Sequence, residues 1–139
     1  MKFSAIAFFA FLSICLAQSP YPVPIPSLDL HKVQGLWHVV LGYPADAYSN
    51  EKCETWNVNV LDTSSVNLTM IRITQDGQIY SNDASVHISH NGSVWQDEYG
   101  SPVDWISFDP AHGAWGTLAA SDDQAAVILS RTPTLSTEI

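Results

Sequence analysis

The sequence predicts an all-β fold, an eight-stranded antiparallel up-and-down barrel, over most of its 139 residues. Eight short runs have the composition of strands, turn residues separate them, and no long helical period occurs once the first run has begun. This pattern fits a barrel or a β-sandwich, and the residues at the two ends of the series favour the barrel. The expected strands are residues 37–43, 54–61, 65–74, 78–89, 94–97, 103–108, 114–120 and 125–131.

The first 17 residues have the features of a secretory signal peptide. Lys2 supplies a positive start, residues 5–16 are almost wholly apolar, and Cys15-Leu16-Ala17 precedes the expected cleavage site before Gln18. The apolar run is shorter than a comfortable membrane span, and no later stretch is apolar enough to be one. We therefore expect a secreted, extracellular protein without an integral membrane span.

A proline-rich arm and a short helix precede the first strand. Residues 18–27 contain four of the eight prolines and are expected to form an extended arm. The spacing of Leu28, Leu30 and Val33 then predicts one short turn of helix. Residues 28–139 are expected to form a single barrel domain, because a chain of this length supports one compact core.

Each break in the series of strands carries residues that favour turns. The Asp76-Gly77 pair suits a tight hairpin between the third and fourth strands. The other breaks contain Pro44 and Asn50, His90-Asn91-Gly92, Asp109-Pro110 with Gly113, and Asp122-Asp123.

Alternation along the strands separates an inward face from an outward one. If Asn67 faces outward, the apolar residues beside it face inward, where an eight-stranded barrel has room for one small ligand. The rings of Trp56 and Trp115 are expected to face this cavity, although tryptophans of this kind also fill packed cores. The expected cavity residues are Trp56, Val58, Val60, Leu68, Met70, Val86, Trp115 and Ala119.

The two ends of the series predict how the barrel is closed. Trp37, at the start of the first strand, can fill the end of the barrel where the first and last strands meet. The guanidinium of Arg131, at the end of the last strand, can lie over this ring in a cation–π contact of about 0.5 to 2 kcal/mol. Gly35 lets the chain pass close beneath the barrel. We expect Gly35, Trp37 and Arg131 to close this end.

The chain resembles secreted lipocalins of the apolipoprotein D and bacterial lipocalin type. The residues that carry the resemblance are 30–40 (LHKVQGLWHVV), Cys53-Glu54-Thr55-Trp56, and 128–136 (ILSRTPTLS). The resemblance implies an eight-stranded barrel with a C-terminal helix packed outside. It also implies a carrier of a small hydrophobic ligand, such as a lipid, sterol, retinoid or pigment.

The sequence departs from the lipocalin pattern in two places. The middle motif of the family is represented only by Ser121-Asp122-Asp123, and the C-terminal helix is missing or truncated. Ser136 is placed to cap a helix, and Glu138 suits its first turn. We expect the chain to be a fragment, with a variant that has lost the helix as the alternative.

One cysteine and two asparagines are candidates for the covalent modifications of a secreted protein. Signal cleavage leaves Cys53 as the one remaining cysteine. In similar lipocalins a cysteine before the second strand is tied to one after the C-terminal helix, so Cys53 is a disulfide candidate; a dimer linked through Cys53 is the alternative. Asn67-Leu68-Thr69 and Asn91-Gly92-Ser93 are acceptors for glycosylation.

The charge of the chain is strongly acidic, with 14 acidic and 5 basic residues and a formal net charge of −9. Nucleic acid and anionic membrane surfaces are poor partners for such a chain. An acidic rim around the cavity would favour an amine-bearing ligand, which is one alternative to a neutral one. A secreted β-sandwich or adhesion module that binds a protein partner is another.

No pattern in the sequence points to catalysis, to a cofactor or to a metal. His87 and His90 are a close pair of histidines, but a spacing of three on a strand does not put both rings on one face. Gly-x-Ser-x-Gly elbows and glycine-rich phosphate loops are absent from the sequence. Asp97, Glu98 and Asp104 are expected to be solvated carboxylates. The expectation is a binding protein and not an enzyme.

Overall fold

The computed structural model describes residues 23–120 and 125–134. The expected signal peptide, the first part of the arm, the Ser121-Asp122-Asp123 motif and the helix start at Ser136 lie outside the described residues. The strands are β1 (Gly35–Tyr43), β2 (Glu51–Val60), β3 (Ser65–Thr74), β4 (Ile79–Ser89), β5 (Val94–Gln96), β6 (Pro102–Phe108), β7 (Trp115–Ala120) and β8 (Ala126–Ser130). The helical segments are α2 (Leu30–Val33), η1 (Ala45–Tyr48) and η2 (His90–Gly92).

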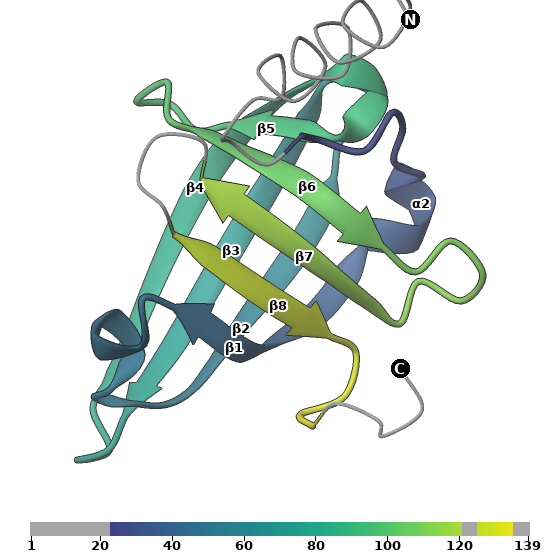
Figure 1. Cartoon of the computed structure of the whole chain (residues 1–139). Coiled ribbons are helices and arrows are strands. Elements are labelled where there is room, and N and C mark those ends of the chain that lie inside the picture. The colour runs from purple at the N-terminus through teal and green to yellow at the C-terminus, as the bar shows by residue number, and fades with distance from the viewer. Residues whose placement is uncertain (1–22, 121–124, 135–139) are drawn as a thin grey trace, which may run out of the picture.

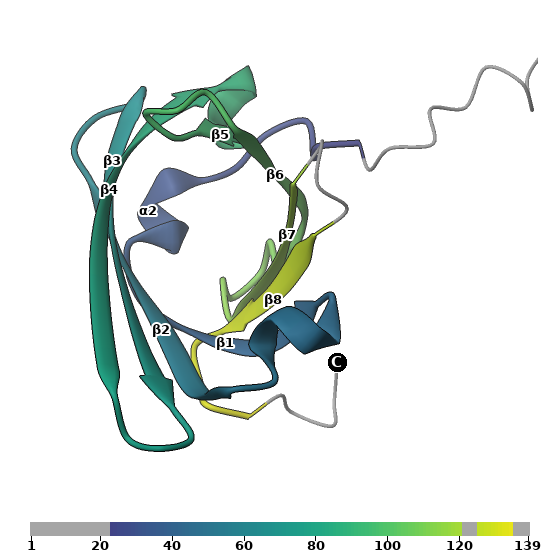
Figure 2. The same ribbon diagram turned by 90° about the vertical axis from the view of Figure 1, so that its left-hand side faces the viewer.

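The eight strands form one closed antiparallel barrel in chain order (Figures 1 and 2). Each strand pairs with the next along the chain, and β8 returns to pair with β1, from His38–Ser130 to Tyr43–Ala126. This confirms the predicted fold class, and it rules out a sandwich of two separate sheets. Consecutive strands pair because the turns predicted from the sequence are short.

The turns divide between two ends of the barrel. The β2–β3, β4–β5 and β6–β7 connections share one end with α2, which Figure 2 shows across the barrel opening. We call it the closed end. Asp29 caps α2 by accepting the His31 N–H at 3.0 Å. In the β6–β7 turn, Asp109 accepts the N–H groups of Ala111, His112 and Ala114 at 3.1 to 3.2 Å. These bonds lower the pKa of Asp109.

Arg131 joins the last strand to the chain that crosses the closed end. Its guanidinium carbon lies 3.7 Å from the centre of the Trp37 ring, and the Trp37 side chain is fully buried. Gly35 has a φ of +103°, and an added Cβ there would lie 3.5 Å from Arg131 Nη1. The Arg131 nitrogens donate to the carbonyl oxygens of Lys32 (2.7 Å), Gln34 (2.8 Å), Leu36 (2.7 Å) and Gly113 (3.4 Å).

An aromatic cluster fills the barrel next to this contact. Trp37 meets Trp105 and Phe108 edge-on, with ring centroids 6.1 and 6.3 Å apart, and Trp105 meets Trp95 at 5.4 Å. Gly116 is required here, because a Cβ at this position would collide with the Trp105 ring. The cluster forms a solid floor on the closed side of the interior.

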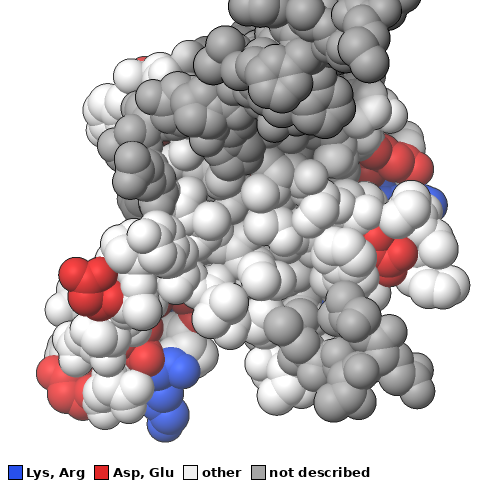
Figure 3. All heavy atoms as spheres, viewed as in Figure 1, with Lys and Arg blue, Asp and Glu red and all other residues white. Residues whose placement is uncertain are grey.

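The outer surface shows where the charge of the chain lies. In Figure 3, Asp and Glu atoms gather toward the two ends of the barrel, whereas the described atoms over β7 and β8 are uncharged. This agrees with the outward residues of these strands, which include Thr117, Ala126 and Ile128. The acidity is therefore distributed at the ends and not along this wall.

Replacing Arg131 by lysine tests the closure. Lysine keeps the charge but loses the planar set of donors, so we expect the free energy of unfolding to fall by about 2 kcal/mol or more. Urea unfolding followed by circular dichroism measures it. Arg72→Lys is the matched control; it alters a half-exposed ion pair and should change stability by less than about 1 kcal/mol. Equal effects of the two substitutions would contradict this account of the closed end.

Candidate ligand-binding site

A cavity of about 270 Å³ lies inside the barrel on the open side of the aromatic floor. Its wall comes from strands β2 to β7 and is predominantly apolar. The apolar residues that line it are Trp56, Leu68, Met70, Ala84, Val86, Trp95, Val103 and Leu118. A largely preformed, apolar hollow of this kind is typical of a small-molecule site.

The pairing of strands explains how these residues come together. Trp56 on β2 lies opposite Met70 on β3, and Leu68 on β3 lies opposite Ala84 on β4. Directly paired residues share a face of the sheet, so all four point into the barrel. Ala84 is the small one of the four, and its short side chain leaves space for the cavity.

Four of the predicted cavity residues line the hollow: Trp56, Leu68, Met70 and Val86. Val58 and Val60 share the inward face of β2 with Trp56, but they lie nearer the closed end. Val58 belongs to the packed core and is only 1% exposed, and the half-buried Val60 packs against that core. They support the wall without lining the cavity.

Strand β7 has the opposite phase to the predicted one. Leu118 lines the cavity and Gly116 faces Trp105, so the alternating residues Trp115 and Ala119 lie on the other face. The reason is steric, because the Trp105 ring occupies the space beside Gly116. The sequence prediction followed the large ring of Trp115 and missed this contact.

Several lining residues were absent from the predicted set. Trp95 comes from β5, which has only three residues and shows no alternation to interpret. Val103 lies in a strand with apolar residues on both faces. A weak signal was available for Ala84, which stands two residues before the predicted inward residue Val86.

The polar side of the cavity is acidic. Asp83, Asp97, Glu98, Asn82 and Tyr99 complete its lining, and no Lys, Arg or His belongs to it within the part of the chain that the structure describes. Strand β4 pairs with β5 only at residues 87–89, so its earlier residues have no β5 partner. The cavity therefore reaches the surface between β4 and the β5–β6 turn.

The β5–β6 turn is held in shape by its own hydrogen bonds. One carboxylate oxygen of Asp97 accepts the N–H groups of Tyr99 and Ser101, both at 2.9 Å. Glu98 and Tyr99 are exposed at the tip, and Tyr99 is 86% exposed. Two carboxylates and an aromatic ring thus stand at this opening.

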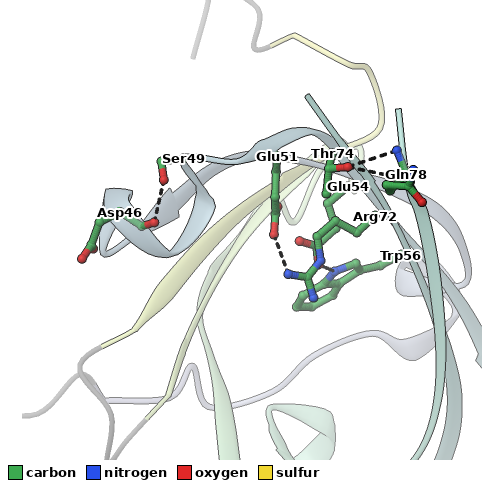
Figure 4. Close-up of polar contacts among 8 residues, drawn as sticks. All are labelled: Asp46, Ser49, Glu51, Glu54, Trp56, Arg72, Thr74 and Gln78. Carbon is green, nitrogen blue, oxygen red and sulfur yellow. Dashed lines mark hydrogen bonds and ion pairs between the residues drawn. The ribbon is translucent and has the colours of Figure 1, made fainter. Parts of the chain in front are cut away.

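A second polar group lies above Trp56 at the open end, and Figure 4 shows it. The Trp56 Nε1–H donates to Glu54 Oε1 at 2.5 Å, and Arg72 Nη1 lies 3.1 Å from Glu51 Oε1. We call Glu51, Glu54 and Arg72 the mouth cluster. An irregularity in the β2–β3 register between Glu51 and Cys53 puts Glu51 opposite Thr74, on the same side as Glu54.

The environment of Glu51 changes its acidity. Burial, a hydrogen bond with the Glu54 carboxyl and the charge of Glu54 raise the pKa of Glu51 to about 7, although Arg72 opposes the shift. Tyr48 of η1 packs over Gly42 beside this group, and burial followed by the charges of Glu54 and Glu51 raises its pKa.

The other predicted site residues lie on the outside. Cys53 is an exposed free thiol, and both acceptor residues, Asn67 and Asn91, are exposed. His87 and His90 are exposed too, and no group of three His, Cys, Asp or Glu suited to a metal ion occurs in residues 23–120 and 125–134. Among the described residues, no helix is long and apolar enough to cross a membrane.

Comparisons with solved structures identify the architecture. The cockroach major allergen Per a 4 matches with a TM-score of 0.67 at 16% identity, over 87% of this chain and 78% of that one. Insecticyanin from the tobacco hornworm Manduca sexta matches with 0.67 at 15%, over 87% and 72%. The siderocalin Ex-FABP matches with 0.61 at 12%, over 77% and 78%.

These proteins are lipocalins with an eight-stranded barrel. The chain described here has the lipocalin fold, as its resemblance to lipocalins predicted. At 12 to 16% identity the likeness establishes the fold. No model of a protein family matches the chain, and a search of curated proteins finds no match either.

Proposed function

We propose that this protein is an extracellular carrier that holds a small hydrophobic molecule in the barrel cavity. The observation that carries the proposal is the apolar cavity between Trp56 and Trp95, above the solid aromatic floor. A ligand there is removed from water on most sides, because the closed end is plugged. The signal-like residues 1–17 and the acceptors Asn67 and Asn91 support a secreted protein.

The physical basis of binding is the burial of apolar surface. Each 100 Å² of ligand surface removed from water contributes about 2.5 kcal/mol, before the cost of immobilising the ligand. Aromatic rings add offset or edge-on contacts to an unsaturated ligand. Among the described residues that line the cavity, no nucleophile is paired with a base, and we propose binding and release without a chemical step.

Filling the cavity tests the carrier function. Ala84→Phe places a ring in the hollow, and we expect it to weaken binding of a hydrophobic probe such as retinol at least about tenfold. Quenching of tryptophan emission measures the affinity, since Trp56 and Trp95 line the cavity. Ser85→Phe is the matched control, because the neighbouring Ser85 is exposed on the outer face. Loss of binding in both variants, or in neither, argues against the cavity as the site.

A more specific candidate is a ligand with a hydrophobic body and a protonated amine. Asp97 and Glu98 stand at the opening, Asp83 beside them accepts the Thr69 hydroxyl at 2.7 Å on the outer face of the sheet, and no basic residue lines the described wall. An ammonium group at the opening gains Coulomb attraction from these carboxylates and a cation–π contact with Tyr99. An anionic head group meets only like charge there.

Three probes with the same twelve-carbon chain test this candidate. We expect dodecylammonium to bind about tenfold more tightly than dodecanol, and dodecanoate to bind more weakly than either, below micellar concentrations. In the double variant Asp83→Asn with Glu98→Gln, the dissociation constants of dodecylammonium and dodecanol should become similar. Asp46→Asn with Asp62→Asn removes the same charge away from the cavity and should preserve the difference. Tightest binding of dodecanoate would exclude an amine-bearing ligand.

A further inference from the structure

The mouth cluster connects a titratable group to the ligand cavity through a short chain of contacts. Glu51 forms an ion pair with Arg72 at 3.1 Å, Arg72 lies directly opposite Glu54 in the β2–β3 pairing, and Glu54 accepts the Trp56 indole N–H. The same Trp56 ring forms part of the cavity wall. Figure 4 shows Glu51 pointing toward the Arg72 guanidinium, which lies beside the Trp56 indole. A change at Glu51 therefore acts on the wall through one intermediate carboxylate.

The groups that face Glu51 come from three elements. Glu54 lies on its own strand β2, Arg72 reaches across from β3, and Tyr48 comes from η1. The Glu51 side chain is only 10% exposed, whereas Arg72 is 51% exposed. The carboxyl is thus largely removed from water while its cation is not, so the guanidinium compensates incompletely for burial.

The two protonation states of Glu51 differ in what they do to Glu54. A protonated Glu51 donates a hydrogen bond to the Glu54 carboxylate, and Arg72 balances the one remaining negative charge. An ionised Glu51 has no proton to donate, and its negative charge repels the Glu54 carboxylate. In that state two carboxylates compete for one guanidinium, and the acceptor of the Trp56 N–H is no longer held in place.

We propose that the mouth cluster is a proton-dependent latch, in which protonated Glu51 fixes Glu54 and Trp56 and ionised Glu51 releases them. The Trp56 side chain in the cavity wall is then held in one position in mildly acidic solution and is more mobile in mildly alkaline solution. The latch acts on the cavity of the proposed carrier, so its effect on affinity rests on that function. Its effect on Trp56 does not.

The sign of the linkage follows from the raised pKa. Glu51 holds its proton to about pH 7 in the folded protein, against 4.5 for an unperturbed glutamate. Between these values the folded state binds more protons than the unfolded state, so the contribution of Glu51 to stability falls as pH rises from 4.5 to about 7. A ligand that needs the firm wall binds more weakly across the same transition.

Indole N–H resonances give a test that needs no ligand. We expect the Trp56 Nε1–H signal, assigned by its loss in Trp56→Phe, to shift with a midpoint near pH 7 in the wild-type protein. The signal should stay fixed in Glu51→Gln, in which the amide donates permanently. Trp37 and Trp95 are internal controls, since their indoles donate to the carbonyl oxygens of Val33 and Gly92.

A second variant keeps the test decisive if Glu51→Gln does not fold. Burial is the largest cause of the raised Glu51 pKa and the Glu54 charge adds to it, so Glu54→Gln should move the Trp56 midpoint downward. The histidines also titrate in this range. The test therefore compares the pH profile of the Trp56 signal in the wild type with that in each variant, because the histidines are the same in all of them. An unchanged midpoint in the variants, or a pH-independent Trp56 signal in the wild type, would overturn the latch.

Dodecanol supplies the binding test because it does not titrate. We expect its dissociation constant to rise about fivefold from about pH 6 to about pH 8.5, and to be constant in Glu51→Gln. Asp62→Asn removes an exposed carboxylate of the β2–β3 turn, away from both the cavity and the mouth cluster, and should retain the wild-type profile. Equal profiles for wild type and Glu51→Gln would refute the latch. Absence of dodecanol binding at every pH would count against the carrier function, and the Trp56 resonance would then decide the latch.

Discussion

The barrel depends on one guanidinium at its closed end. Arg131 directly follows the last strand and covers the face of Trp37. Its planar array of donors reaches carbonyl oxygens on segments about a hundred residues earlier. Trp37 in turn supports the edges of Trp105 and Phe108. The position of the aromatic floor, and with it the depth of the cavity, follows from this contact.

The interior changes character along a single strand. On β2 the inward residues run from Val58 in the packed core, through Trp56 at the cavity wall, to Glu54 at the mouth. The packed core, the cavity wall and the charged mouth are therefore stacked in layers about 6 to 7 Å apart, the repeat of every second residue of a strand. This arrangement explains how a small chain carries a polar mouth without weakening its core.

The sequence was sufficient for the eight strands and their order, because turn residues and alternation are local signals. It was insufficient where one side chain takes its place from another far along the chain. The phase of β7 depends on the Trp105 ring beside Gly116, and Glu51 turns inward only because the β2–β3 register shifts. Neither contact can be recognised from the alternation of apolar and polar residues along the strand. The resemblance to the apolipoprotein D and bacterial lipocalin type stays a prediction from the three sequence segments that carry it.

The shortness of β5 affects the shape of the cavity opening. Three residues pair with the end of β4, and beyond them the wall is interrupted beside the turn that carries Tyr99. Under the proposed carrier function, this gap leaves room for a long chain to extend out of the cavity, whereas the surrounding strands limit the width of the ligand. We therefore expect ligands of similar cross-section and different length.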